Sequence, residues 1–391
     1  MNHKALGQKI TCQQAHAALV ITFSLSTACA VSAENGATPP SGGTATKSPS
    51  LYDQIWKYSE FYHNDDNAVI QSFRFTGRFQ LDYAVVDQDG FDDLAIRRFR
   101  LGGKATLFKD FTLHAEVDLQ PEADPVYQRL TDTYLAWSRS RAFVFTVGKQ
   151  GAPFTMDGST SSKELLAIDR ANLANNLWFP QEYMPGVSAT GQPGNWSYHL
   201  GLYSSGSATP EFGNFDGGVF VLSTVGYEFA ESLKAKKAVL ALNYIHNEED
   251  EDNTFTRSLG DVASVNFNFE KSRWGFRTDL SGGLGYGGQS DLWGVMLMPY
   301  CNITPKFQAV ARYTWLKSRD DNGVRFARYE DQVESGRGDE YNEVYFGLNY
   351  YFYGHKLKLQ SGVQYADMRD QANDGGDYSG WAWTTGLRIG W

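Results

Sequence analysis

Most of this chain alternates between apolar and polar residues with a period of two. The clearest example lies between Ser72 and Val85, where every second residue from Phe73 onward is apolar or glycine and the residues between are polar up to Asp82. A period of two places successive side chains on opposite faces of a β-strand. Strands this long exceed the usual five or six residues, and they are typical of transmembrane β-barrels, whose walls face lipid outside and water inside.

The same pattern recurs along the chain and predicts about sixteen strands, an even number as single-chain bacterial barrels require. Tight turns such as Lys109-Asp110 alternate with longer polar loops such as 319–340, which indicates an antiparallel barrel over residues 70–391 with its short turns in the periplasm. The predicted strands are 70–85, 96–108, 111–119, 130–138, 142–149, 183–191, 195–204, 218–229, 237–247, 258–270, 274–285, 289–302, 306–318, 341–353, 356–367 and 380–391.

Composition supports a barrel rather than a helical membrane protein. Aromatic residues make up 15% of the chain, yet the mean hydropathy is −0.42, as a wall with two different faces would give. Beyond the N-terminus no apolar run approaches the roughly 20 residues of a membrane helix. The last eleven or so residues alternate up to Trp391, as the final strand of outer-membrane barrels does. The alternative, a soluble edge strand, would be prone to aggregation.

The N-terminal 69 residues precede the predicted barrel. Residues 1–33 have the charged, apolar and small-residue regions of a cleaved signal peptide, with an uncleaved anchor or a lipid on Cys29 as alternatives. Residues 34–69 are predicted to be a disordered linker followed by a short periplasmic segment, ambiguous between a helix and a docked strand. Since Cys12 and Cys29 fall in the signal, the mature chain keeps only Cys301 and no internal disulfide is expected.

Charge and motifs exclude several function classes. Removing Lys4 and Lys9 with the signal changes the net charge from −10 to −12, which argues against a nucleic-acid partner. The seven histidines are scattered without metal-ligand spacing, and no GxSxG nucleophile motif occurs. The glycine-rich run 281–288 lacks the Lys-Ser/Thr of a phosphate-binding loop, and the acidic run 248–252 lacks calcium-loop spacing. We therefore expect no metal, no cofactor and no catalysis.

Basic residues on the first two predicted strands share the face opposite the apolar one. A basic patch on the lumen wall favours anions, and guanidinium groups suit phosphate or carboxylate. An equally weighted alternative is that these bases pair with Asp82, Glu116 and Asp118 and brace the wall. The bases are Arg74, Arg78, Arg98, Arg100 and Lys104.

Residues 149–184 are the longest stretch without alternation. Long irregular loops are uncommon in compact architectures and tend to be functional. We expect this third long loop to fold into the barrel and narrow it.

Several motifs resemble the phosphate-selective porin O/P family. They are 147–154 (VGKQGAPF), Ser161-Ser162-Lys163 and Ile168-Asp169-Arg170-Ala171 in this loop, and Gly77-Arg78-Phe79-Gln80, Arg97-Arg98-Phe99-Arg100 and Asp132-Thr133-Tyr134-Leu135 on predicted strands. One difference is Gln181-Glu182 before Tyr183, where relatives usually carry Arg.

The resemblance implies a homotrimeric channel of sixteen strands in the outer membrane of a Gram-negative bacterium, in contact with lipid and lipopolysaccharide. It also implies an inward loop and permeants such as phosphate. The site residues it implies are Pro153 and Phe154 in the constriction loop, and Lys163, Asp169, Arg170, Arg78, Arg98 and Arg100 along the anion pathway. We also assign Lys149, at the start of the loop, to the constriction.

The sequence thus predicts a porin for passive diffusion of small hydrophilic solutes with a preference for anions. Lys163 and Arg170 of the loop are expected to face Arg74, Arg78, Arg98 and Arg100. Two alternatives belong to other classes. One is a non-conducting barrel that serves as an adhesin or envelope anchor, with the segment before the barrel as a tether. The other is an outer-membrane enzyme, which lacks a nucleophile and base here.

Overall fold

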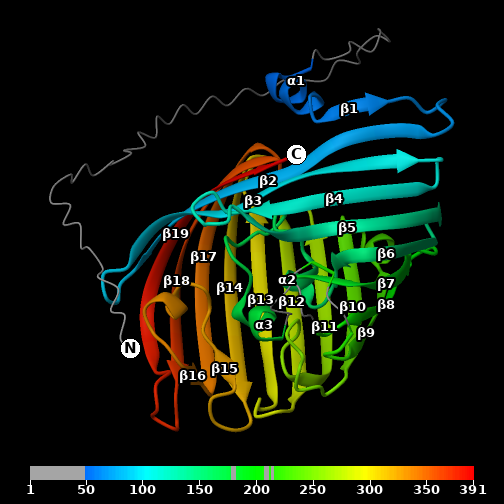
Figure 1. The fold of residues 1–391 in the computed structure, drawn as a ribbon. Helices are drawn as coiled ribbons and strands as arrows, with labels where there is room; N and C mark the ends of the chain where they lie inside the picture. Colours follow the sequence, from blue (N-terminus) through cyan, green and yellow to red (C-terminus); the bar gives the residue numbers. More distant parts are fainter. Residues whose placement is uncertain (1–48, 178–181, 207–210, 213–214) are drawn as a thin grey trace, which may run out of the picture. The chain divides into compact units, whose positions relative to one another are not determined.

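A computed structural model describes residues 49–177, 182–206, 211–212 and 215–391. Sixteen antiparallel strands form a closed barrel in which each strand pairs with its neighbours in the chain and β19 pairs with β2 (Figure 1). This confirms the predicted antiparallel β-barrel of about sixteen strands. The barrel strands are β2 (Ile70–Val86), β3 (Asp92–Leu107), β4 (Phe111–Leu119), β5 (Tyr127–Ser140), β6 (Phe143–Gly151), β7 (Tyr183–Gly191), β8 (Trp196–Ser204), β9 (Val219–Glu228), β10 (Lys237–Asn247), β11 (Leu259–Lys271), β12 (Trp274–Gly285), β13 (Leu292–Asn302), β14 (Phe307–Ser318), β17 (Glu340–Tyr353), β18 (Leu357–Arg369) and β19 (Tyr378–Gly390).

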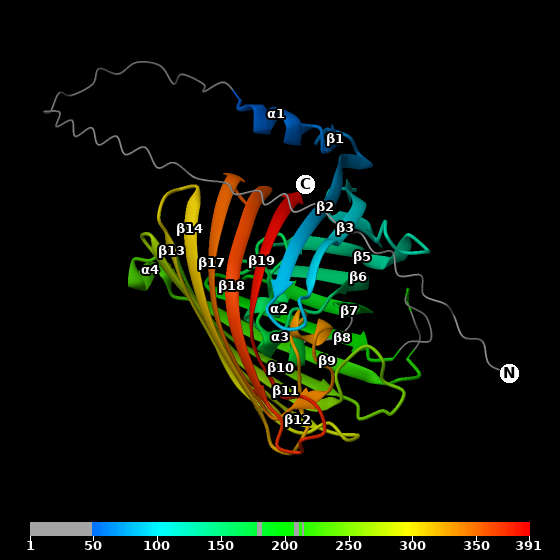
Figure 2. The same cartoon turned by 90° about the vertical axis from the view of Figure 1, so that its left-hand side faces the viewer.

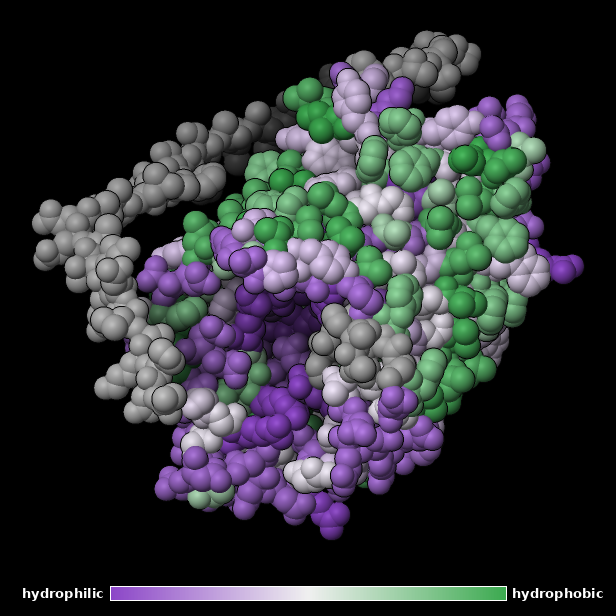
Figure 3. Space-filling view, viewed as in Figure 1, coloured by the Kyte–Doolittle hydropathy of each residue, from purple (hydrophilic) through white to green (hydrophobic). Residues whose placement is uncertain are grey.

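The two faces of the wall differ as the alternation predicts. Along β19, Trp381 and Trp383 are exposed on the outer face, whereas Ala382, Thr384 and Arg388 between and beyond them are buried. Figure 3 shows hydrophobic residues over the outer wall and hydrophilic residues around and inside the opening at the loop end. An apolar exterior and a polar interior are the arrangement of a barrel surrounded by lipid.

Connections at the two ends of the barrel differ in length. Short turns follow β3, β5, β7, β11, β13 and β17, and the short helix α4 (Ala230–Leu233) follows β9. The other end carries the longer loops, of which the β6–β7 loop is the third and contains α2 (Met156–Ser159) and α3 (Asn172–Leu177). The β14–β17 loop contains β15 (Val324–Arg325), η1 (Glu330–Gln332) and β16 (Arg337–Gly338). No helix in the described ranges is long and apolar enough to cross a membrane.

The segment before the barrel contains both structures that the sequence left open. Helix α1 (Leu51–Lys57) begins at a capping box formed by Ser50 and Asp53, and β1 (Glu60–His63) pairs antiparallel with β2. The Trp56 indole N–H donates to the Gly390 carbonyl at 2.6 Å, which ties α1 to the end of the last strand. The predicted signal peptide and residues 34–48 of the predicted linker lie outside the described residues.

Candidate functional site

A β-bulge in β3 places two neighbouring arginines on the inner face of the barrel. Gln80 of β2 pairs with Arg98, but the next pair joins Leu81 to Ile96, so Arg97 is an extra residue. An extra residue in one strand re-aims its side chains. The Arg97 Nε lies 3.5 Å from the Asp169 carboxylate in the β6–β7 loop, and the Arg98 Nη1 donates to the Gln80 side chain at 2.9 Å. Strict alternation did not predict that Arg97 faces the interior. The only sequence signal for it was the run of arginines at 97, 98 and 100.

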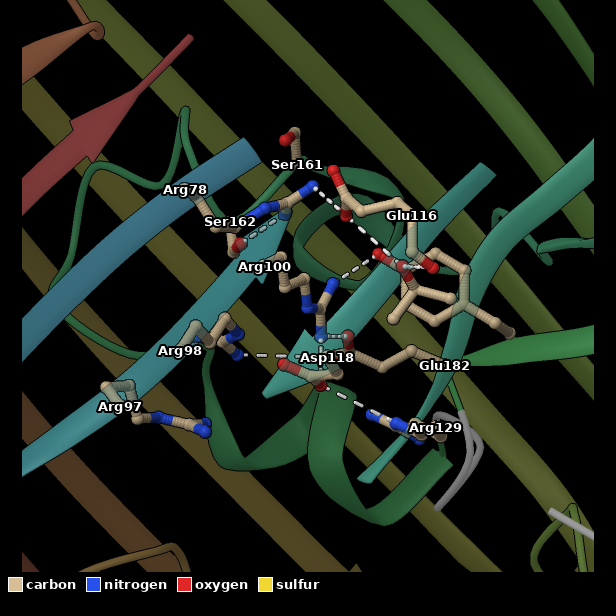
Figure 4. Close-up of polar contacts among 12 residues, drawn as sticks. Arg78, Arg97, Arg98, Arg100, Glu116, Asp118, Arg129, Ser161, Ser162 and Glu182 are labelled. Carbon is tan, nitrogen blue, oxygen red and sulfur yellow. Dashed lines mark hydrogen bonds and ion pairs between the residues drawn. The ribbon is translucent and has the colours of Figure 1, made fainter. Parts of the chain in front are cut away.

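Glu182, at the end of the β6–β7 loop, contacts three guanidinium groups. Its carboxylate oxygens lie 3.0 Å from Arg170 Nη1, 3.3 Å from Arg100 Nη2 and 3.7 Å from Arg98 Nη2 (Figure 4 shows Arg98, Arg100 and Glu182). Burial opposes ionisation of this carboxyl, but the arginines outweigh it and hold its pKa well below the usual range. Glu182 therefore carries a negative charge at any physiological pH and links β3 to the loop.

Other wall arginines pair with carboxylates on neighbouring strands. Arg78 Nη2 lies 3.3 Å from Glu116 of β4, and Arg100 Nη2 lies 3.3 Å from Asp118 (Figure 4). The same pattern joins Arg388 of β19 to Asp82 of β2. These pairs correspond to the wall-bracing arrangement that the sequence left open beside the anion pathway.

The β6–β7 loop contacts the wall at β2, which lies four places from β6 in the ring. Ser162 accepts a hydrogen bond from Arg78 Nη1 at 2.7 Å through its hydroxyl, and its carbonyl accepts one from the Gln80 amide at 3.0 Å. Arg170 also binds within the loop, donating to the carbonyls of Asp157 and Thr160 at 2.9 and 3.0 Å. The loop is thus fixed to β2 and closed on itself.

The same loop also contacts strands far from β6 and β7. Buried side chains of β14, β17, β18 and β19 donate to backbone carbonyls of residues 165–169, and these strands lie several places away from β6 and β7 in the ring. Figure 2 shows α2 and α3 within the ring of strands. The donors and their distances are Lys358 to Leu165 (2.6 Å), Asn349 to Leu166 (2.8 Å), Arg388 to Ile168 (3.3 Å) and Arg312 to Asp169 (2.7 Å).

The remaining predicted site residues fall in different places. The Lys163 Nζ donates to the backbone carbonyl of Trp391 at 2.9 Å. Arg74 is exposed at the end of β2 beside its cross-strand partner Lys104. Lys149 and Phe154 are buried, with exposed fractions of 2% and 0%. The structure thus gathers Arg78, Arg98, Arg100, Asp169 and Arg170 around the loop, while Arg74 lies apart.

Among the cavities that adjoin the loop, two are lined by both Arg170 and Glu182. The first has a volume of about 490 Å³ and is also lined by Arg78, Lys104, Asp132 and Pro153. Its charged residues are three bases and two acids, a formal charge of +1. The second has a volume of about 260 Å³. It is lined by the bases Arg97, Arg98, Arg170, Arg257, Arg312 and Arg328 and the acids Asp169, Glu182, Glu330 and Glu343.

The second cavity therefore has a formal charge of six minus four, or +2, with all four acids ionised. The whole chain has a net charge of −10, so this lining differs in sign from the protein average. A locally positive wall attracts anions even in an acidic protein, because nearby charges dominate the field inside a confined space. In the described residues, no group of three or more His, Cys, Asp or Glu side chains is arranged to hold a metal ion.

A closed sixteen-strand barrel with an apolar exterior and charged internal cavities defines a channel of the outer-membrane porin class. The sequence model of a family described as phosphate-selective porin O and P matches residues 73–260. This match confirms the resemblance seen in the motifs. A comparison with curated proteins gave no match.

Solved porins share the fold at low sequence identity. The anion-selective porin from Comamonas acidovorans is 12% identical, with 82% of this chain and 99% of that chain covered and a TM-score of 0.58. The outer membrane channel DcaP of Acinetobacter baumannii is 11% identical, with coverages of 81% and 97% and a TM-score of 0.55. Salmonella typhi OmpF in complex with daunomycin is 12% identical, with coverages of 85% and 100% and a TM-score of 0.61.

Proposed function

We propose that this porin favours small anions of the phosphate type and that its β6–β7 loop forms the constriction. The observation that carries the proposal is the second cavity, where six arginines face four carboxylates beside the loop. Passive diffusion through a water-filled lumen needs no binding step stronger than this local attraction, since a permeant must also leave.

Arg97 and Arg98 are the residues best placed to attract a permeant. Arg98 makes one hydrogen bond to Gln80 and a long 3.7 Å contact to Glu182, and it lines the second cavity. Its remaining N–H donors are therefore available to a hydrated oxyanion. Guanidinium groups present paired donors that match phosphate and carboxylate oxygens. Arg170 lines both cavities, so an anion leaving one encounters it again in the other.

Loop contacts with strands far from β6 and β7 in the ring support the constriction. Ser162 is bound to β2, while the carbonyls of residues 165–169 are bound by β14, β17, β18 and β19. A segment that leaves the wall at β6, returns at β7 and is held by the arc from β14 to β2 reduces the cross-section between these parts of the wall. Its charged residues Asp169 and Arg170 then lie where permeants pass, and their local field sets ion preference.

Assembly and export complete the proposal. One similar structure, OmpT of Vibrio cholerae, is described in a trimer form, at 14% identity and a TM-score of 0.53. We propose a homotrimer for this chain as well, exported by a cleaved signal peptide at residues 1–33. Its apolar outer wall would contact outer-membrane lipid and lipopolysaccharide.

The test is conductance of the purified protein in planar bilayers with chloride, phosphate and pyrophosphate. The variant Arg98→Gln, alone and with Arg100→Gln, is expected to shift the reversal potential toward cations in a salt gradient, because it removes positive charge from the lumen. A matched control is Arg273→Gln, which removes a base from the exposed β11–β12 turn. An unchanged reversal potential in both lumen variants would sink the anion pathway. Absence of any conductance would favour the non-conducting barrel.

A further inference from the structure

Three arginines of the long loops gather beside the second cavity. Arg257 lies in the β10–β11 loop and lines that cavity, whereas Arg325 and Arg337 are direct cross-strand partners in the β15–β16 pair. In the described part of the chain, no ion pair joins any of the three to a carboxylate. Like charges placed directly opposite each other in paired strands are destabilising. This cluster therefore costs stability unless something compensates it.

Two buried donors in the arginine cluster have no acceptor. Arg257 Nη2 donates to the Asn175 carbonyl at 3.0 Å, and Arg337 Nη1 donates to the Gln289 side chain at 3.3 Å. Arg257 Nε and Arg325 Nη1, however, are buried without a hydrogen-bond partner. An unsatisfied buried donor is costly, and more so when it belongs to a charged group.

Burial and neighbouring positive charges also lower the pKa values of two arginines in the cluster. Burial and the nearby Arg257 and Arg337 lower the pKa of Arg325 to about 9. Burial and the nearby Arg337 lower the pKa of Arg257 to about 10. Arg257 and Arg325 are still charged at neutral pH, so the repulsion in the cluster persists.

The backbone prevents the cluster from spreading. Two fully buried asparagines of α3 hold Arg325: Asn172 Nδ2 donates to its carbonyl at 2.9 Å, and its N–H donates to Asn176 Oδ1 at 2.8 Å. Because α3 belongs to the β6–β7 loop, these bonds join the two loops. Arg325 is therefore fixed beside Arg337 and Arg257 by contacts that do not involve its charge.

We propose that Arg257, Arg325 and Arg337 bind an oxyanion carrying at least two negative charges, of the phosphate class. The anion accepts from the unpartnered guanidinium donors and cancels their repulsion, which ties the β10–β11 and β14–β17 loops to α3. This is a resident ligand that orders the loops, distinct from ions passing through the lumen. The phosphate can come from solution or from a lipopolysaccharide headgroup.

Hydrogen exchange followed by mass spectrometry tests the site locally. Full-length protein in detergent is compared in inorganic phosphate and in chloride at equal ionic strength. Phosphate is expected to slow amide exchange in segments 254–258 and 322–338 of the wild type in a saturable way. The double variant Arg257→Gln with Arg337→Gln should lose this protection, with phosphate affinity lower by at least about tenfold, as expected for losing a charged hydrogen bond.

A matched control is Arg319→Gln in the same β14–β17 loop, because Arg319 is exposed and already paired with Asp291. It should keep the phosphate effect. In chloride, the double variant should exchange no faster than the wild type in these segments, since it relieves repulsion. Unchanged exchange in the barrel strands shows that a variant folds.

A second arm replaces phosphate by purified lipopolysaccharide. Protection only in that arm, lost in the double variant, identifies the lipid phosphate as the ligand. Protection that persists in the double variant, or none in either arm, would overturn the site. Bilayer selectivity is a separate readout, so a channel without anion preference could still show phosphate-protected loops, and the converse also holds.

Discussion

Replacing Glu182 by Gln removes a negative charge beside the β6–β7 loop, whereas the arginine variants remove positive charges. It therefore tests the same charge balance with the opposite expected sign. Glu182 is the shared partner of Arg98, Arg100 and Arg170, at 3.7, 3.3 and 3.0 Å. The substitution keeps the size of the side chain and deletes one negative charge from the lining of both cavities. We expect the channel to become more selective for anions. Glu182 is also the acid that departs from the usual family pattern.

The magnitude follows from Coulomb's law for an ion passing close to the carboxylate. A unit charge about 5 Å from an ion in a water-like medium is worth about 0.8 kcal/mol. Its removal lowers the energy of an anion and raises that of a cation by this amount, so the permeability ratio should change by about 15-fold. The stability cost should be near the lower end of the 3–5 kcal/mol typical of breaking a buried pair, because the Glu182 side chain is 20% exposed.

Reversal potentials in a chloride gradient measure the effect. The control Glu231→Gln makes the same chemical change on α4 in an exposed turn and should leave the reversal potential unchanged. A shift of Glu182→Gln toward cations, or none, would refute the reasoning that this carboxylate offsets the arginines in the permeation path.

Three further predictions concern pH, a contact between two loops and the segment before the barrel. Burial raises the pKa of Glu330 to about 7, so this cavity-lining carboxyl gains its negative charge as pH rises through 7; anion selectivity should fall between pH 6 and 8, and Glu330→Gln should abolish that dependence in bilayer measurements. Asn176→Ala removes two hydrogen bonds to the Arg325 backbone and should speed amide exchange in the β14–β17 loop several-fold without altering the strands. Trp56→Phe removes the bond to Gly390 and should cost about 1 kcal/mol, read as faster proteolysis before β2 while the barrel stays intact.

Strand number and order were predictable because the signal is local. In a barrel wall each residue faces either lipid or the interior, so a period of two is imposed along the whole chain. The main deviation, the earlier start of β3 at Asp92, follows from the bulge at Arg97, where one extra residue shifts the phase. In a sequence, such a shift of the alternation looks like the end of a strand. For this reason the alternation did not predict Arg97 as an inward-facing base.

The partners of the charged residues were decided by the tertiary structure. The sequence by itself determined a two-faced barrel, basic residues on the inner face of its first strands, and one long loop without strand pattern. It could not determine that Glu182 joins Arg98, Arg100 and Arg170, or that Lys163 reaches Trp391, because these contacts join residues far apart in the chain. Closure of the barrel brings such residues together, and charge pairing depends on distance in space, which alternation along one strand does not encode.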